Sequence, residues 1–131
     1  MSIDITKAID RKAHRRAVAL PTGQVVQELI LLLGDQLVAQ LAGVQDPRSV
    51  RDWASDRHGV RAEVERRLRF ALYIGELLGQ DDARDVVKAW FQGLNPALED
   101  HSPLDVLRDN STNVGDAERR VLGAAREFMF G

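Results

Sequence analysis

Apolar side chains recur every three or four residues along most of the chain. Positions at that spacing lie on one face of an α-helix, so each run predicts an amphipathic helix with a buried face. The longest run, residues 61–78, carries an apolar stripe wide enough to be covered from two sides, and it predicts the central helix. Two earlier runs have their apolar positions at Val25, Val26, Leu29, Ile30, Leu33, Leu37, Val38, Leu41 and Ala42. The pattern therefore predicts an all-α fold.

Short local signals predict where several helices begin, turn or cross. Thr22 and Asp35 stand where a capping side chain would satisfy the first free N–H groups of a helix. Gly43 follows a helical run, so we expect it to make a turn with positive φ. Gly75 lies inside the central helix, where glycine costs about 1 kcal/mol relative to alanine. We therefore expect another helix to cross closely at Gly75.

Residues 1–21 form the first of three predicted regions and are rich in basic side chains. A weak apolar stripe is backed by Lys7, Arg11, Lys12, Arg15 and Arg16. This pattern predicts a basic arm or a short helix, which would lie along DNA phosphates, where each neutralised phosphate adds affinity that salt removes. A solvated, partly frayed terminus would have the same composition.

The second region, residues 22–79, contains the outline of a helix-turn-helix. A short helix and the turn at Gly43 precede a second helix, which begins with Asp46 as N-cap and Pro47 in the first turn. The outward face of that second helix would enter the major groove, where arginine reads guanine and serine contacts a base or phosphate. The candidate DNA-binding residues are Arg48, Ser49 and Arg51, with Arg57 contacting phosphate only. Nearby aspartates lower the positive potential of this face, so an ordinary capped helix is an open alternative.

The third region, residues 80–131, contains a stiff corner between two helices. Trp90 and Phe91 end an amphipathic run and are expected to be buried, and Gly93 follows where a left-handed residue would end the helix. The residue before a proline avoids the helical conformation, so the following Asn-Pro pair keeps the chain extended. Ser102 and Pro103 then predict the N-cap and first turn of the next helix.

A tryptophan, a Leu-Asn-Pro-x-Leu turn, a short spacer and Ser-Pro-Leu-x-x-Leu follow one another at Trp90, 94–98 and 102–107. This arrangement resembles the C-terminal segment of the Xre/MbcA/ParS antitoxin family, whose members neutralise RES-domain toxins. The family usually has a proline shortly after its helix-turn-helix-like segment and often a glycine shortly before the Ser/Thr-Pro pair. This chain has neither.

The resemblance implies the antitoxin of a type II toxin–antitoxin system. It implies a helix-turn-helix-like N-terminal part and a small helical C-terminal toxin-binding part. The implied partners are a RES-domain toxin, an enzyme that consumes NAD or transfers ADP-ribose from it, and operator DNA for autorepression. We expect a homodimer or a larger hetero-oligomer with toxin. An orphan dimeric helix-turn-helix transcriptional regulator and a structural adaptor remain alternatives.

We expect the C-terminal helix and tail to contact the toxin, because the family places its C-terminal segment at or in the toxin's active-site cleft. An aromatic anchor supplies most of the binding energy at such an interface, and surrounding charges set its register. The predicted toxin-binding residues are Arg119, Arg126, Phe128, Met129, Phe130 and Gly131. If Phe128 and Met129 instead complete the core, little but Phe130 remains for the toxin. If a chain without residues 127–131 still folds and neutralises the toxin, the inhibitory surface is expected on residues 94–105.

Charge and composition limit the remaining chemistry. Residues 1–75 contain 12 Lys+Arg against 9 Asp+Glu (net +3), and residues 76–131 contain 6 against 11 (net −5). The basic half suits phosphate and the acidic half suits a protein surface. The chain has no cysteine, its three histidines stand far apart, and no phosphate-binding or nucleophile motif occurs. We therefore expect no enzyme activity, no metal site and no cofactor.

The longest uninterrupted apolar run, residues 29–33, is too short to span a membrane. The N-terminus lacks the apolar core of a signal peptide. We therefore expect a cytoplasmic protein with no membrane contact.

Overall fold

The computed structural model of the protein describes residues 3–80 and 82–130. Over these residues the chain forms eight α-helices and one short 3-10 helix, with no strand. The predicted all-α fold is therefore confirmed. The elements are α1 (Ile3–Ala19), α2 (Thr22–Leu33), α3 (Asp35–Ala42), α4 (Pro47–Ala54), α5 (Ala62–Leu78), α6 (Arg84–Gln92), η1 (Pro96–Leu98), α7 (Pro103–Arg108) and α8 (Val114–Phe130).

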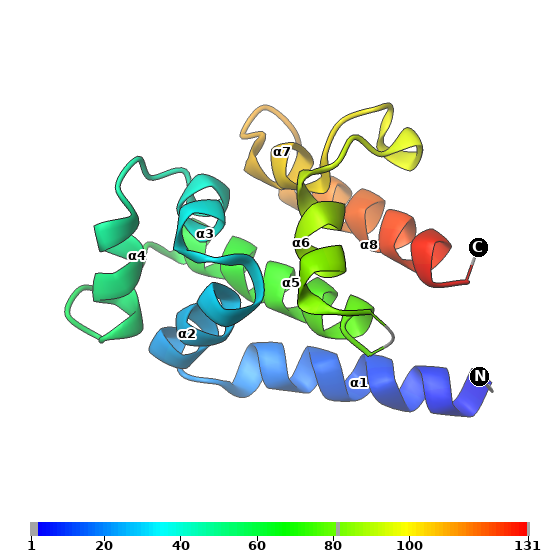
Figure 1. The fold of residues 1–131 in the computed structure, drawn as a ribbon, viewed down its shortest axis with the longest axis horizontal. Helices are drawn as coiled ribbons and strands as arrows, with labels where there is room; N and C mark the ends of the chain where they lie inside the picture. The colour runs from blue at the N-terminus through cyan, green and yellow to red at the C-terminus, as the bar shows by residue number, and fades with distance from the viewer. Residues whose placement is uncertain (1–2, 81, 131) are drawn as a thin grey trace.

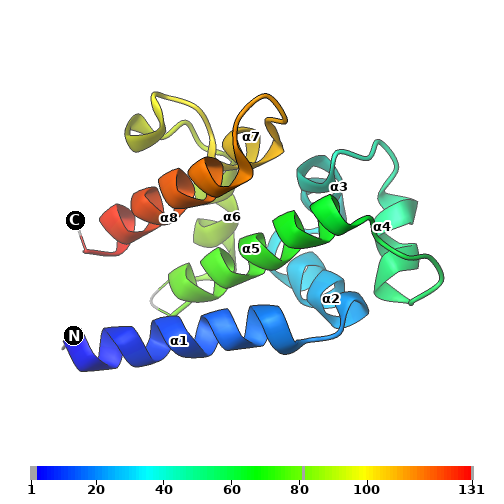
Figure 2. The ribbon, with the colours of Figure 1, turned by 180° about the vertical axis from the view of Figure 1, so that it is seen from behind.

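Helix α5 is the centre of the fold, as its wide apolar stripe predicts. Helices α1, α2, α3 and α8 all contact it, and Figure 2 shows α5 running between α1 and α8. In Figure 1, α2, α3 and α6 lie on the viewer's side of α5. A Cβ added to Gly75 would overlap the side chain of Leu32 in α2. The predicted close crossing at Gly75 is therefore confirmed.

One hydrophobic core joins the three predicted regions. Ala13 and Ala17 of α1, Leu72 of α5, Phe91 of α6 and Val121 of α8 are all buried in a single cluster. The first region is therefore a 17-residue helix packed on α5 and not an extended arm.

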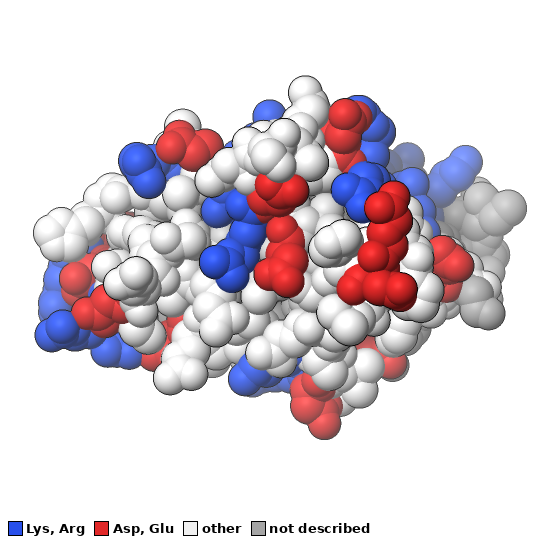
Figure 3. Space-filling view, turned by 90° about the horizontal axis from the view of Figure 1, so that it is seen from above, with Lys and Arg blue, Asp and Glu red and all other residues white. Residues whose placement is uncertain are grey.

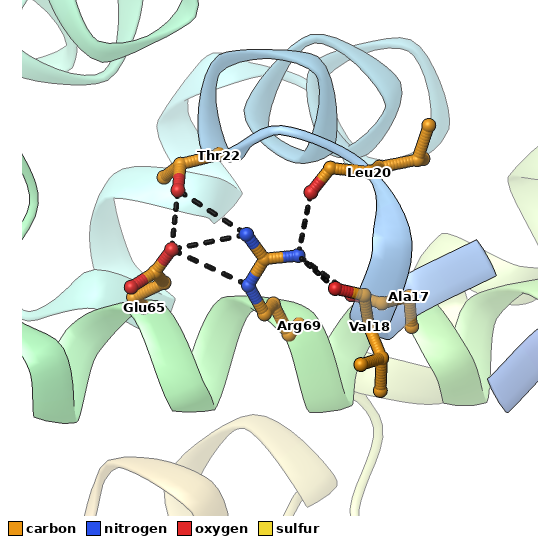
Figure 4. Close-up of polar contacts among 6 residues, drawn as sticks. All are labelled: Ala17, Val18, Leu20, Thr22, Glu65 and Arg69. Carbon is orange, nitrogen blue, oxygen red and sulfur yellow. Dashed lines mark hydrogen bonds and ion pairs between the residues drawn. The ribbon is translucent and has the colours of Figure 1, made fainter. Parts of the chain in front are cut away.

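Arg69 fastens the end of α1 to α5 (Figure 4). Its Nη1 atom donates to three backbone carbonyls, those of Ala17 (2.9 Å), Val18 (3.2 Å) and Leu20 (2.7 Å). Its Nη2 atom donates to the Glu65 carboxylate at 3.0 Å, and the Thr22 hydroxyl donates to the same carboxylate. The Thr22 hydrogen bond, followed by that of Arg69, holds the pKa of Glu65 below its usual value. Because carbonyls at a helix C-terminus lack partners within the helix, one guanidinium closes α1 and fixes the turn into α2.

Several local predictions are confirmed. The side chains of Asp46 and Ser102 accept hydrogen bonds from backbone N–H groups at 2.9 and 3.1 Å, so both are N-caps. Gly43 has φ of 79° in the turn between α3 and α4. Trp90 and Phe91 are buried, with exposed fractions of 8% and 0%.

Three other local predictions are wrong. Thr22 and Asp35 are the first residues of α2 and α3 and do not cap them. Each side chain has a partner on another helix instead, Glu65 for Thr22 and Arg51 for Asp35. Gly93 is extended, with φ −78° and ψ 150°, and is not left-handed. The chain leaves α6 directly into the extended backbone that the Asn-Pro pair requires.

The corner between α6 and α7 closes on itself. The Asn95 side chain caps η1, and the Asn95 N–H donates to the His101 carbonyl at 3.0 Å in an isolated antiparallel bridge. Leu98 points into the core and is fully buried. Glu99 and Asp100 complete the loop in the left-handed conformation, with φ of 55° and 62°. The corner is therefore a compact, internally bonded unit attached to the core by Leu98.

Candidate functional site

The predicted DNA-binding arginines lie on or just after α4, and each meets a carboxylate. The pairs are Arg48–Asp46 at 2.8 Å, Arg51–Asp35 at 2.5 Å and Arg57–Asp52 at 3.8 Å. The Arg48 side chain holds the pKa of Asp46 below its usual value through a hydrogen bond. Ser49, the fourth predicted residue, is half-buried. Figure 3 shows basic and acidic side chains next to one another at the end of the molecule that carries α4, on the left. The structure thus brings the predicted residues together on a surface whose positive charge is compensated.

The predicted toxin-binding residues do not form one patch. Arg119 pairs with Asp116 on its own helix. Arg126 pairs with Asp10 of α1 at 3.2 Å. Met129 is half-buried against the core. The two phenylalanines are partly exposed, Phe128 at 46% and Phe130 at 57%, and Gly131 lies outside the described residues.

Helix geometry separates these side chains further. Successive residues turn by about 100°, so Phe130 points about 200° away from Phe128 around the axis of α8. Arg119 lies eleven residues before Phe130, about 16 Å along the axis at 1.5 Å per residue. Phe128 shares the face of α8 that buries Val121 and Ala124. Phe128 is therefore the predicted residue that continues the packed face of α8 outward.

A shallow apolar groove lies where Phe128 leaves the core. The groove has a volume of about 500 Å³ and is formed by α6, the corner and α8. The Phe128 ring lies 6.4 Å from the Trp90 ring, measured between centroids. Leu94 is 74% exposed and Val86 is 39% exposed. The residues that line it are Val86, Ala89, Trp90, Gly93, Leu94, Asn95, Pro96, Ala97, Ala124, Glu127 and Phe128. We call it the C-terminal groove.

Trp90 forms the buried side of the C-terminal groove. Its indole Nε1 is buried and has no hydrogen-bond partner among the described residues, so the ring contributes apolar contact only. Val86 was not among the predicted toxin-binding residues, and Leu94 was included only in the alternative surface on residues 94–105. Their signal in the sequence is weak: Leu94 stands alone between Gly93 and the Asn-Pro pair, and Val86 sits beside the buried Val87.

A second hollow, of about 590 Å³, lies between α1, α5 and α8. On its wall the Tyr73 hydroxyl donates to Asp10 at 2.5 Å, and burial, followed by Asp10, raises the pKa of Tyr73. At its rim Arg66 pairs with Glu118 at 2.7 Å. These polar groups satisfy one another and hold α1 and α8 against α5.

The described residues contain no group of three or more His, Asp or Glu side chains placed to hold a metal ion. None of the helices within 3–80 and 82–130 combines the length and the apolar character needed to cross a membrane. Comparison with protein-family models, with curated proteins and with solved structures finds no match to the chain.

Proposed function

We propose that the chain is the cytoplasmic antitoxin of a type II toxin–antitoxin system and that it binds and inactivates a RES-domain toxin without being an enzyme itself. The observation that carries the proposal is the C-terminal groove. It exposes Leu94 of the corner and Phe128 of α8 together, with Val86 of α6 beside them. Residues 119–131 are the predicted toxin-binding segment, and residues 94–105 are the predicted alternative surface.

The chemistry of the C-terminal groove is that of a protein-binding surface. A cluster of exposed apolar side chains marks an interaction site more often than scattered ones do. Aromatic residues in partly desolvated pockets supply much of the energy at such interfaces. Phe128, backed by Trp90, is the anchor in this assignment, and Leu94 widens the contact from the corner. Phe130 and Arg119 would reach only a rim, and Met129 belongs to the core.

The backbone of the corner gives a second line of support. Glu99 and Asp100 adopt a left-handed conformation, which costs most residues about 1 kcal/mol and costs glycine almost nothing. They stand shortly before the Ser102-Pro103 pair, where members of the resembled family often have a glycine. A loop that needs positive φ at this place explains why glycine would be used there in other chains.

Autorepression through operator DNA, as a homodimer or as a hetero-oligomer with toxin, belongs to the same proposal as its weaker part. To contact DNA through α4, Arg48, Arg51 and Arg57 would have to exchange their aspartate partners for phosphates or bases. That exchange lowers the net gain from each contact. Toxin binding is therefore the main function that we assign.

The test is neutralisation of a RES-domain toxin, and the open reading frame next to this chain's gene is the first candidate to examine. We expect Phe128→Ala to raise the Kd for the toxin about 30-fold or more, because a hot-spot residue contributes at least about 2 kcal/mol and 1.4 kcal/mol is tenfold. Leu94→Ala should weaken binding in the same direction. Co-purification, titration calorimetry and rescue of cell growth are the measurements.

The matched control is Leu31→Ala, which removes a leucine that is 65% exposed on α2, away from the C-terminal groove. It should leave toxin binding unchanged. A Phe128→Ala/Leu94→Ala protein that folds and still neutralises the toxin would refute the assignment. If the chain binds no toxin but binds DNA upstream of its own gene more tightly than a random duplex, it is the orphan dimeric regulator.

A further inference from the structure

The solvent side of α1 carries four basic residues that the core does not use. They are Lys7, Arg11, Lys12 and Arg15, all exposed, and we call them the basic face of α1. Arg11 and Arg15 each stand two residues from Ala13, which is buried at 2% exposure. At about 100° per residue they point roughly 200° away from it. The basic face therefore looks outward, away from α5.

The basic face differs from other arginines of the chain in its carboxylate contacts. Among the side chains that the structure describes, none of the four has a carboxylate oxygen within 4.0 Å. By contrast, Arg16 on the adjoining side of α1 pairs with Glu28 at 2.5 Å and Glu76 at 2.8 Å. The α4 arginines are likewise paired. Over the side chains that the structure describes, the basic face of α1 thus carries positive charge without the carboxylate contacts that the α4 arginines have.

The spacing of these positive charges does not stabilise α1. Lys7, Arg11 and Arg15 follow one another at intervals of four, so each is the neighbour of the next on the helix surface. Like charges at that interval destabilise a helix by about 0.2–0.5 kcal/mol per pair. The basic face therefore lowers the stability of α1, and binding an anion would relieve the repulsion.

We propose that the basic face of α1 binds the phosphate backbone of double-stranded DNA without reading its sequence. From Lys7 to Arg15 the helix rises about 12 Å. That length matches about three or four phosphates along one strand, at 3.4 Å of duplex axis each. This contact does not depend on the toxin, and for a duplex of arbitrary sequence it lies on α1 and not on α4.

The surroundings of the basic face favour a duplex over other polyanions. A membrane-surface helix needs a free apolar face to insert, whereas Ala13 and Ala17 of α1 are buried against the rest of the protein. Single-stranded nucleic acid is usually held by bases stacked on aromatic side chains, and α1 contains no Phe, Tyr or Trp. The basic face of α1 is a straight row of positive charges, and such a row matches the regular phosphate backbone of a duplex.

The experiment is an anisotropy titration of the full chain with a labelled duplex of random sequence, between 50 and 200 mM NaCl. We expect the log–log salt slope of the wild-type chain to lie between about −2.7 and −3.6, because each of three or four neutralised phosphates contributes about −0.9. The K7Q/R11Q/K12Q/R15Q variant should have a slope close to zero and bind at least about tenfold more weakly at 50 mM salt. Its helical circular dichroism should be unchanged, because these side chains are exposed.

The matched control is R48Q/R51Q/R57Q, which removes three arginines from the α4 surface. It should retain the wild-type slope and affinity. Three results would overturn the inference: no duplex binding by the wild-type chain at 50 mM NaCl, an unchanged slope in the α1 variant, or loss of binding confined to the α4 variant. Binding to anionic vesicles but not to the duplex would also overturn it. The α1 variant should still neutralise the toxin. A negative result in the DNA titration would therefore leave the antitoxin proposal unaffected, and the reverse also holds.

Discussion

Trp90 belongs both to the core and to the C-terminal groove. Its ring packs edge to face on Phe91, with centroids 5.3 Å apart, and its exposed fraction is 8%. Its Nε1 donor has no acceptor among the described residues. A buried donor without a partner costs about 1–3 kcal/mol, so the size of the ring accounts for its stabilising effect, and its polar atom works against it.

Substitution at Trp90 should separate these two contributions. Trp90→Ala is expected to lower the free energy of unfolding by about 3–5 kcal/mol, as is usual for a buried tryptophan. Trp90→Phe keeps a ring and removes the unpaired N–H, so its loss should be less than half as large. Urea denaturation of the two variants measures the difference. Equal losses would mean that the indole N–H has an acceptor and stabilises the fold.

At the scale of helices, the apolar spacing predicted where most helices lie in the sequence, because the residues that form a buried face are close together in one helix. Two of the predicted N-caps are confirmed, and two are wrong because the side chain bonds to another helix instead. Asp46 and Ser102 cap their helices, whereas the side chains of Thr22 and Asp35 bond to residues of other helices. An N-cap can be predicted from the local sequence only when its side chain has no hydrogen-bond partner on another helix. The left-handed pair in the corner was missed for a related reason, since nothing local marks Glu99 for positive φ.

The Arg69 contacts predict an asymmetry between two arginines of α5. Arg69→Met removes hydrogen bonds to three carbonyls and to Glu65, so we expect a loss of about 1.5–3 kcal/mol, typical for a charged donor. Arg66→Met removes only a pair with Glu118 in which the Arg66 side chain is 59% exposed, and such pairs contribute less than about 1 kcal/mol. Urea denaturation of both variants is the measurement. Losses of similar size would show that the Arg69 contacts add little to the attachment of α1 to α5.

At the scale of the whole molecule, about half of the candidate site could be predicted from sequence. The apolar C-terminal end drew attention to Phe128 and Phe130, which are both partly exposed. Which of the two continues the packed face depends on the orientation of α8 over the corner, and Leu94 enters the C-terminal groove only through that crossing. The sequence also did not predict that Arg51 of α4 pairs with Asp35, because the two residues belong to different helices.

Residues 1–20 make up most of the region whose sequence predicted a basic arm or a short helix. In the structure α1 buries Ala13 and Ala17 and supplies the carbonyls that Arg69 bonds. A chain starting at Pro21 should therefore lose at least about 3 kcal/mol, which corresponds to a fall of about 10 °C in the unfolding midpoint for a domain of this size. The K7Q/R11Q/K12Q/R15Q variant is the control, since it removes the charge of α1 and keeps its packing; its midpoint should equal or slightly exceed that of the wild-type chain. Thermal unfolding followed by circular dichroism compares the three proteins. A truncated chain with the wild-type midpoint would mean that α1 is separable, and that the core formed by α2 to α8 is stable without it.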